Sequence, residues 1–72
     1  MAQLRLSRFR PGDFVYVKQS VMQSEPDLAA IIMGKRGRVV SVHNGQTLPV
    51  VVVFGTDVDS FGFDDEDLEL AE

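Results

Sequence analysis

The chain has 72 residues, enough for one small domain, with 44% hydrophobic residues, 25% charged residues and a net charge of −4. It has no cysteine, which excludes disulfides and thiolate metal sites, and its single histidine, His43, cannot build a metal site alone. No apolar run approaches the roughly 18 residues of a membrane span, and residues 1–10 lack the apolar core of a signal peptide. We therefore expect no cofactor, no membrane span and a cytoplasmic-type compartment.

The charges are unevenly divided along the chain. All seven basic residues lie between Arg5 and Arg38, whereas only three of the eleven acidic residues lie in the first 38 positions. The remaining positions carry eight acidic side chains and no Lys or Arg. This pattern indicates either two faces of opposite potential or an acidic C-terminal part that folds back against a basic N-terminal part.

The chain is expected to begin with a basic N-terminal arm over residues 1–11, followed by a single domain over residues 12–72. Three apolar side chains of the arm are possible anchors on that domain: Leu4, Leu6 and Phe9. The sequence Pro-Gly-Asp at residues 11–13 predicts a turn between the arm and the first strand.

Residues 14–18 alternate in a way that predicts the first β-strand. Both faces of this strand are apolar. Because one strand cannot point both sets into one small core, Val15 and Val17 are expected to face inward, and Phe14 and Tyr16 outward.

The segment after this strand is ambiguous. Val21 and Met22 are expected in a loop. Beyond them, residues 24–33 fit one short helical turn, with Ser24 as its cap, Pro26 in its first turn and Gly34 after its end. A strand over residues 29–33 is the alternative.

The rest of the chain is typical of β-structure. Strands are predicted at residues 38–42, 48–54, 59–63 and 68–70, with Pro49 at the start of the second of these. Asn44-Gly45 predicts a tight hairpin, residues 64–67 a solvated acidic turn, and Phe61 and Phe63 are expected in the core. About five short strands without a long helix predict a mainly β fold, a small SH3-like barrel.

Catalysis is not expected from these residues. A nucleophile needs an adjacent base, but the chain has no cysteine, and its single histidine, His43, is expected to be an exposed residue beside the Asn-Gly turn. The adjacent carboxylates of residues 64–67 are typical of a solvated face, whereas acid–base catalysis needs carboxyl groups held in different environments. The sequence therefore predicts a protein that is not an enzyme.

The sequence Gly-Lys-Arg-Gly at residues 34–37 fits the G-x-x-G loop of KH domains, which clamps a nucleic-acid backbone. A KH loop leads into a helix, but β-branched residues follow here, so we interpret the stretch as a loop entering a strand. Gly34 and Gly37 then serve backbone geometry, and Lys35 and Arg36 are exposed at the tip, available to an acidic protein partner. Nucleic acid is not the expected partner, and a KH-like or basic-arm binder of single-stranded RNA is the alternative.

The favoured function is protein binding without catalysis. An exposed aromatic patch commonly marks a protein interface. The residues predicted to contact a partner are Phe14, Tyr16, Val21, Met22, Lys35 and Arg36. A barrel that associates only with itself is a further alternative.

Four segments in order, residues 12–21, 34–39, 49–54 and 61–70, resemble the variable (alpha) subunit of ferredoxin–thioredoxin reductase, a small SH3-like barrel. A more distant similarity is to the PsaE subunit of photosystem I. The resemblance implies an accessory subunit in photosynthetic electron transport, in the soluble phase of a plastid or a cyanobacterium. Its implied partner is a catalytic subunit that holds an iron–sulfur cluster.

This chain departs from the family pattern in four ways. The His- and Pro-rich segment of the family is replaced by residues 22–33, and its Trp-containing loop by residues 43–48. Phe14 and Tyr16 stand where the family usually has charged residues, and an N-terminal arm is added. The resemblance therefore leaves open whether the chain is the reductase subunit or a divergent relative.

Overall fold

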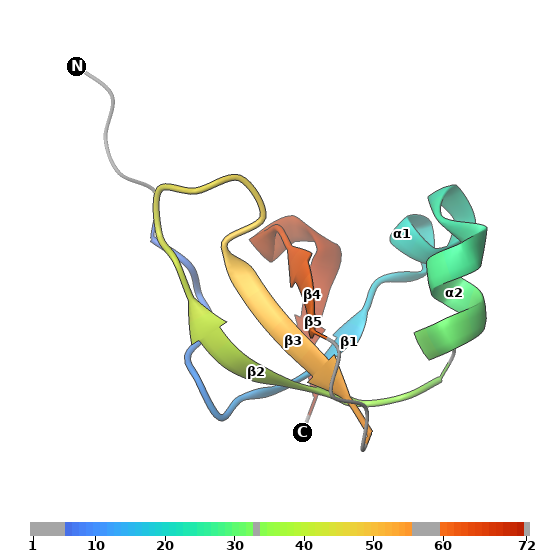
Figure 1. Ribbon diagram of the computed structural model, residues 1–72, viewed down its shortest axis with the longest axis horizontal. Coiled ribbons are helices and arrows are strands. Elements are labelled where there is room, and N and C mark those ends of the chain that lie inside the picture. The colour runs from blue at the N-terminus through green and yellow to red at the C-terminus, as the bar shows by residue number, and fades with distance from the viewer. Residues whose placement is uncertain (1–5, 33, 56–59, 72) are drawn as a thin grey trace.

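A computed structural model of the protein describes residues 6–32, 34–55 and 60–71. These residues form a five-stranded antiparallel sheet and two short α-helices (Figure 1). The predicted anchor Leu4, Met33 in the ambiguous segment and Asp59 in the predicted fourth strand lie outside the described residues. The expectation of a mainly β domain is confirmed.

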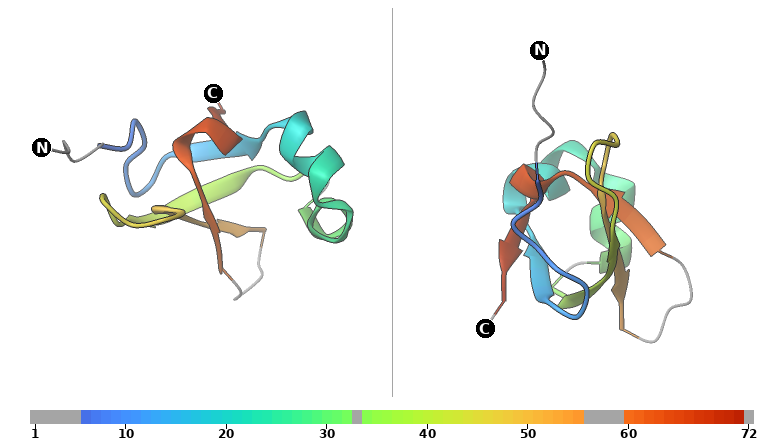
Figure 2. Two further views of the ribbon diagram at one scale, coloured as in Figure 1. Left: turned by 90° about the horizontal axis from the view of Figure 1, so that it is seen from above. Right: turned by 90° about the vertical axis from the view of Figure 1, so that its left-hand side faces the viewer.

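The strands are β1 (Phe14–Val17), β2 (Gly37–Val42), β3 (Val50–Phe54), β4 (Ser60–Phe63) and β5 (Leu68–Leu70). Their order in the sheet is β4-β3-β2-β1-β5, so β4 and β5 are the two edges and the sheet is not closed by pairing between them. The sheet is strongly curved around the core, and the N-terminal segment crosses one end of it (Figure 2).

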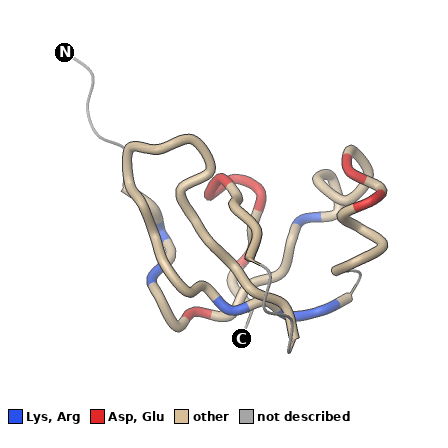
Figure 3. The backbone as a smooth tube through the Cα atoms, viewed as in Figure 1, with Lys and Arg blue, Asp and Glu red and all other residues tan. Residues whose placement is uncertain are grey.

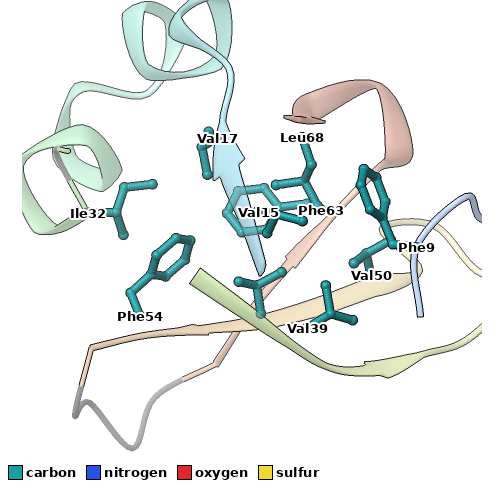
Figure 4. Close-up of a cluster of buried hydrophobic side chains, with 10 residues drawn as sticks. Phe9, Val15, Val17, Ile32, Val39, Val50, Phe54, Phe63 and Leu68 are labelled. Atoms are coloured by element: carbon teal, nitrogen blue, oxygen red, sulfur yellow. The ribbon is translucent and has the colours of Figure 1, made fainter. Parts of the chain in front are cut away.

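The alternating pattern of β1 has the consequence that the sequence predicts. Val15 and Val17 are buried, whereas Phe14 and Tyr16 are exposed. In β3 the same alternation buries Val50, Val52 and Phe54. The inward side chains of the sheet therefore meet in one core (Figure 4), whose buried members are Phe9, Val15, Val17, Ile32, Val39, Val50, Val52, Phe54, Phe63 and Leu68.

The ambiguous segment is helical, which rules out the alternative strand over residues 29–33. It contains α1 (Gln19–Ser24) and α2 (Pro26–Ile32), one helix more than the sequence predicts. Pro26 begins α2 as expected, but Ser24 does not cap it, because Ser24 ends α1 and its hydroxyl donates to the Ser20 carbonyl at 3.1 Å. Gly34, two positions after the last residue of α2, has a φ of 72°, in keeping with its predicted role as a stop.

The connection between β2 and β3 is longer than the tight hairpin that the sequence predicts. A turn does form at Asn44-Gly45, where Gly45 has a φ of 91°. The ladder stops short of this turn, and its last bond runs from the His43 N–H to the Pro49 carbonyl at 2.8 Å. Pro49 has no N–H to return that bond, so strand pairing cannot continue through it.

The fourth and fifth strands confirm most of the C-terminal prediction. Phe63 is buried, and Phe61 is half-buried with its ring centroid 6.1 Å from that of Phe54. The acidic run forms the 3-10 helix η1 (Asp65–Asp67). Its predicted solvation is wrong at one position, because Asp65 is only 7% exposed.

Candidate functional site

Two features of the described residues combine charged and aromatic side chains. The first is the N-terminal anchor, in which Ser7, Arg8 and Phe9 are held at Asp65. The second is the outer face of the sheet, formed by the exposed side chains of Phe14, Tyr16, Arg36, Arg38 and Val40. They lie on opposite sides of β1 and β2, because the anchor inserts Phe9 into the core and the outer face points away from it.

The N-terminal anchor is organised by the buried carboxylate of Asp65. Its Oδ1 accepts the Ser7 hydroxyl at 2.5 Å, and its Oδ2 accepts the Arg8 N–H at 2.6 Å. The Arg8 guanidinium donates to the carbonyls of Asp65 and Leu68 at 2.9 and 3.3 Å. These bonds place Phe9 in the core at 5% exposure.

The anchor accounts for part of the charge asymmetry. A basic residue from the N-terminal segment meets an acidic residue from the C-terminal part, with Arg8 Nε 3.8 Å from Asp65 Oδ2. A hollow beside this contact is lined by Arg8, Phe9, Asp13 and Leu70. The predicted arm is therefore integrated into the domain from Ser7 onward, and among its predicted anchors Phe9 is buried while Leu6 is 68% exposed.

The outer face is centred on Phe14, which is 41% exposed. The Arg36 guanidinium lies over its ring, 4.2 Å from the centroid, a favourable cation–π geometry. Phe14 is also in register with Arg38 on β2, and Arg38 with Val53 on β3. One row across three strands thus carries an aromatic ring, a cation and an aliphatic side chain.

A second part of the outer face lies further along β1. Tyr16 is 44% exposed and stands opposite Glu69 on β5. Val40 is 38% exposed on β2, where a register shift separates Val39 from Ser41. The face therefore combines aromatic, aliphatic and cationic groups, with Glu69 as a carboxylate at its β5 margin.

The structure brings together some of the residues that the sequence predicts for partner binding. Phe14, Tyr16 and Arg36 meet on the outer face, and Lys35 is exposed next to Arg36. Val21 and Met22 differ from the expectation, because they lie in α1 rather than in a loop and pack half-buried against the core. Their apolar side chains are thus occupied within the chain and are not part of the outer face.

Sequence reasoning missed Arg38 and Val40 on this face. The signal that was available is the alternation within residues 37–42, but Val39 and Val40 are chemically equivalent, and the alternation alone does not say which is buried. The pairing of Val39 with the buried Val52 decides it.

Gly37 separates Arg36 from Arg38 and serves a different role from the one predicted. It does not have a positive φ. Instead, a Cβ on this residue would lie 2.4 Å from Cγ1 of Val52 and 2.6 Å from Cε1 of Phe54. Gly37 is therefore required for close packing of β2 on β3, while Gly34 serves backbone geometry as expected.

His43 lies at the surface, and the described acidic residues are not grouped as a metal site. His43 is exposed, and its Nε2 lies 3.0 Å from Oγ of Ser41 in β2, a contact between residues two positions apart. No group of three or more His, Cys, Asp or Glu side chains among residues 6–32, 34–55 and 60–71 is arranged to hold a metal ion. None of the described helices is long and apolar enough to cross a membrane.

Comparison of this chain with family models, with curated proteins and with solved structures finds no match. The function must therefore be argued from the outer face and the N-terminal anchor themselves.

Proposed function

We propose that this chain is an SH3-like barrel domain that binds another protein through its outer face and has no catalytic activity of its own. The observation that carries the proposal is the exposure of Phe14 and Tyr16 on a strand whose other face is already filled by Val15 and Val17. Exposed aromatic groups beside arginine are the side chains that protein interfaces favour.

The strand connectivity supports the SH3-like assignment. Strands β1 to β4 follow one another as antiparallel neighbours, and β5 returns to the free side of β1 directly after η1. The curvature of the sheet brings its two edges around a single core (Figure 2). A half-open barrel of five strands accounts for both features.

The resemblance to the variable subunit of ferredoxin–thioredoxin reductase names a partner for this proposal. By that resemblance the domain docks on the iron–sulfur catalytic subunit of a thioredoxin reductase, as an accessory subunit in photosynthetic electron transport. Such a role requires a binding face and no redox group in this chain, and the chain has no cysteine that could supply one.

The test is binding of the purified full chain to such a catalytic subunit, measured by titration calorimetry. The variant Phe14→Ser/Tyr16→Ser should weaken binding by at least about tenfold, because truncating an aromatic hot-spot residue of an interface costs about 2 kcal/mol or more. The matched control is Leu6→Ser, which removes an apolar side chain that is more exposed but lies off the outer face. Undiminished binding by the double variant would refute the assigned face, and absence of binding by the wild type would refute this partner.

A further inference from the structure

The cations of the outer face are free to pair with groups outside the chain. Within residues 6–32, 34–55 and 60–71 the ion pair is that of Arg8 with Asp65, and Lys35, Arg36 and Arg38 have no carboxylate at ion-pair distance. Arg36 is held over Phe14, and Arg38 is held by its place in the ladder of β2. Two positive charges thus flank an exposed aromatic ring, and the exposed Lys35 precedes Arg36 in the chain.

Three of the described acidic residues, Asp64, Asp65 and Asp67 of the turn before β5, are engaged elsewhere. The acidic turn before β5 lies high in the view of Figure 3, whereas the basic residues that lead into β2 lie at its lower edge. Asp65 is used by the N-terminal anchor. Asp64 and Asp67 form a capping box, in which the Asp64 N–H donates to Asp67 Oδ2 at 3.1 Å.

We infer that the outer face binds an acidic segment of a partner protein, whose carboxylates pair with Lys35, Arg36 and Arg38 while an apolar side chain lies against Phe14 and Tyr16. This inference rests on the proposed function and specifies the partner that it leaves general. A guanidinium stacked on a ring keeps its N–H edges available, and these match a carboxylate in a two-bond contact. Because Arg36 is already placed over Phe14, less side-chain entropy is lost when the contact forms.

The same face is less suited to a nucleic acid. Single-stranded nucleic acids bind to flat aromatic platforms along a continuous positive groove. Here the second aromatic residue, Tyr16, stands opposite the carboxylate of Glu69, which would repel a phosphate backbone. The remaining neighbours, Val40 and Val53, are aliphatic and offer packing rather than stacking. A polypeptide can place an apolar side chain, rather than a charge, beside Glu69 and against these aliphatic neighbours, whereas a nucleic acid carries a charge at every phosphate.

The test is a titration of the isotope-labelled full chain with two synthetic peptides, followed by backbone amide shifts in NMR spectra. The two peptides carry Leu and Phe at the same positions. All remaining positions are Glu in one peptide and Lys in the other. The Glu peptide should shift the amides of β1 and of residues 35–40. The Lys peptide should bind at least about tenfold more weakly than the Glu peptide. Raising the salt concentration should weaken the binding of the Glu peptide, because salt screens exposed charges.

The decisive variant is Arg38→Glu, with Arg10→Glu as its control. Both make the same charge change at an exposed residue, but Arg10 lies in the N-terminal segment and off the outer face. Arg38→Glu should lower the affinity for the Glu peptide by at least about tenfold, which corresponds to roughly 1.4 kcal/mol. Arg10→Glu should lower this affinity by less than about twofold. The dispersed amide spectrum of each variant reports whether it is folded.

The other outcomes each decide the matter. Equal binding of both peptides to this face would refute the acidic partner and leave the protein-binding face standing. No shift on the outer face with roughly 1 mM of either peptide would overturn the inference. If single-stranded oligothymidine binds more tightly than the Glu peptide, and Arg38→Glu abolishes that binding, then the occupant of the outer face is a nucleic acid and not a protein segment. Shifts of the same residues that depend on protein concentration alone would make a second copy the occupant.

Discussion

The described part of the chain contains two arginine–phenylalanine pairs, and the two phenylalanine rings differ in burial. The Arg8 guanidinium lies 5.0 Å from the ring centroid of Phe9, and Arg36 lies 4.2 Å from that of Phe14. Phe9 is 5% exposed and belongs to the core, whereas Phe14 is 41% exposed. The first pair is completed by Asp65, and the second has no acidic partner in the described part of the chain.

The difference shows that the residue types of a pair do not determine its use. Both pairs join an arginine to a phenylalanine, the first between neighbours in the chain and the second between residues 14 and 36. The two pairs differ in the groups that surround them. The buried carboxylate of Asp65 holds Arg8, and Phe9 packs in the core. The second pair stands on the other side of the sheet, whose inner face is filled by other side chains. The first pair is thus part of the fold, and the second is available for binding.

Among substitutions that test the difference between the two pairs, we expect the largest effect on stability at Phe9. We expect Phe9→Ala to lower the free energy of unfolding by about 3–5 kcal/mol, because it removes a buried ring from the core. Urea denaturation followed by circular dichroism measures the loss. The control Leu6→Ala, at a side chain that is 68% exposed, should stay within about 0.5 kcal/mol of the wild type. If Phe9→Ala unfolds at the wild-type urea concentration, the N-terminal segment does not belong to the core.

A substitution at Gly37 tests how closely β2, which carries Arg38 of the outer face, packs on the core. A methyl group at this position meets Val52 and Phe54, so Gly37→Ala should cost about 1–3 kcal/mol through overpacking. Thermal unfolding of the variant measures this cost. Lys35→Ala, in the same loop but exposed, is the control and should be nearly neutral. A neutral Gly37→Ala would contradict the close approach of β2 to β3.

Asp65 is the residue that makes the two pairs different. Replacing it with Ala leaves the Ser7 hydroxyl and the Arg8 N–H without their acceptor, which should cost about 1–3 kcal/mol. Chemical denaturation measures the change, and hydrogen exchange should show faster exchange at the Arg8 amide. Glu69→Ala, at an exposed acid of β5, serves as the control. Unchanged exchange at Arg8 would show that Asp65 does not hold the anchor.

The smallest effect is a direct comparison of the two arginines. We expect Arg8→Ala to cost about 1 kcal/mol, because its guanidinium bonds to the carbonyls of Asp65 and Leu68. Arg36→Ala should change stability by about 0.5 kcal/mol, since an exposed cation–π contact contributes little. Parallel urea titrations of the two variants measure the difference. Equal losses, or a larger loss for Arg36, would contradict the assignment of the first pair to the fold and the second to binding.

Part of the fold and of the site could be predicted from local patterns. The alternation of residues 14–17 was enough to place Phe14 and Tyr16 outside, and Pro26 and Gly34 marked the ends of α2. Helix α1 was missed because residues 19–24 are mostly polar and show no helical period. Asp65 was assigned to the solvent with its acidic neighbours, since nothing local distinguishes it from Asp64 or Glu66.

The sequence by itself determined the mainly β character, the outward aromatic residues of β1 and the separation of basic from acidic residues along the chain. These depend on periodicity and composition, which act between neighbouring residues. Only the tertiary structure decided that Phe9 is core, that Asp65 is buried, and that Arg38 and Val40 join Phe14 on one face. Each of these depends on strand register or on a contact between residues more than 20 positions apart, and such pairings leave no period in the sequence.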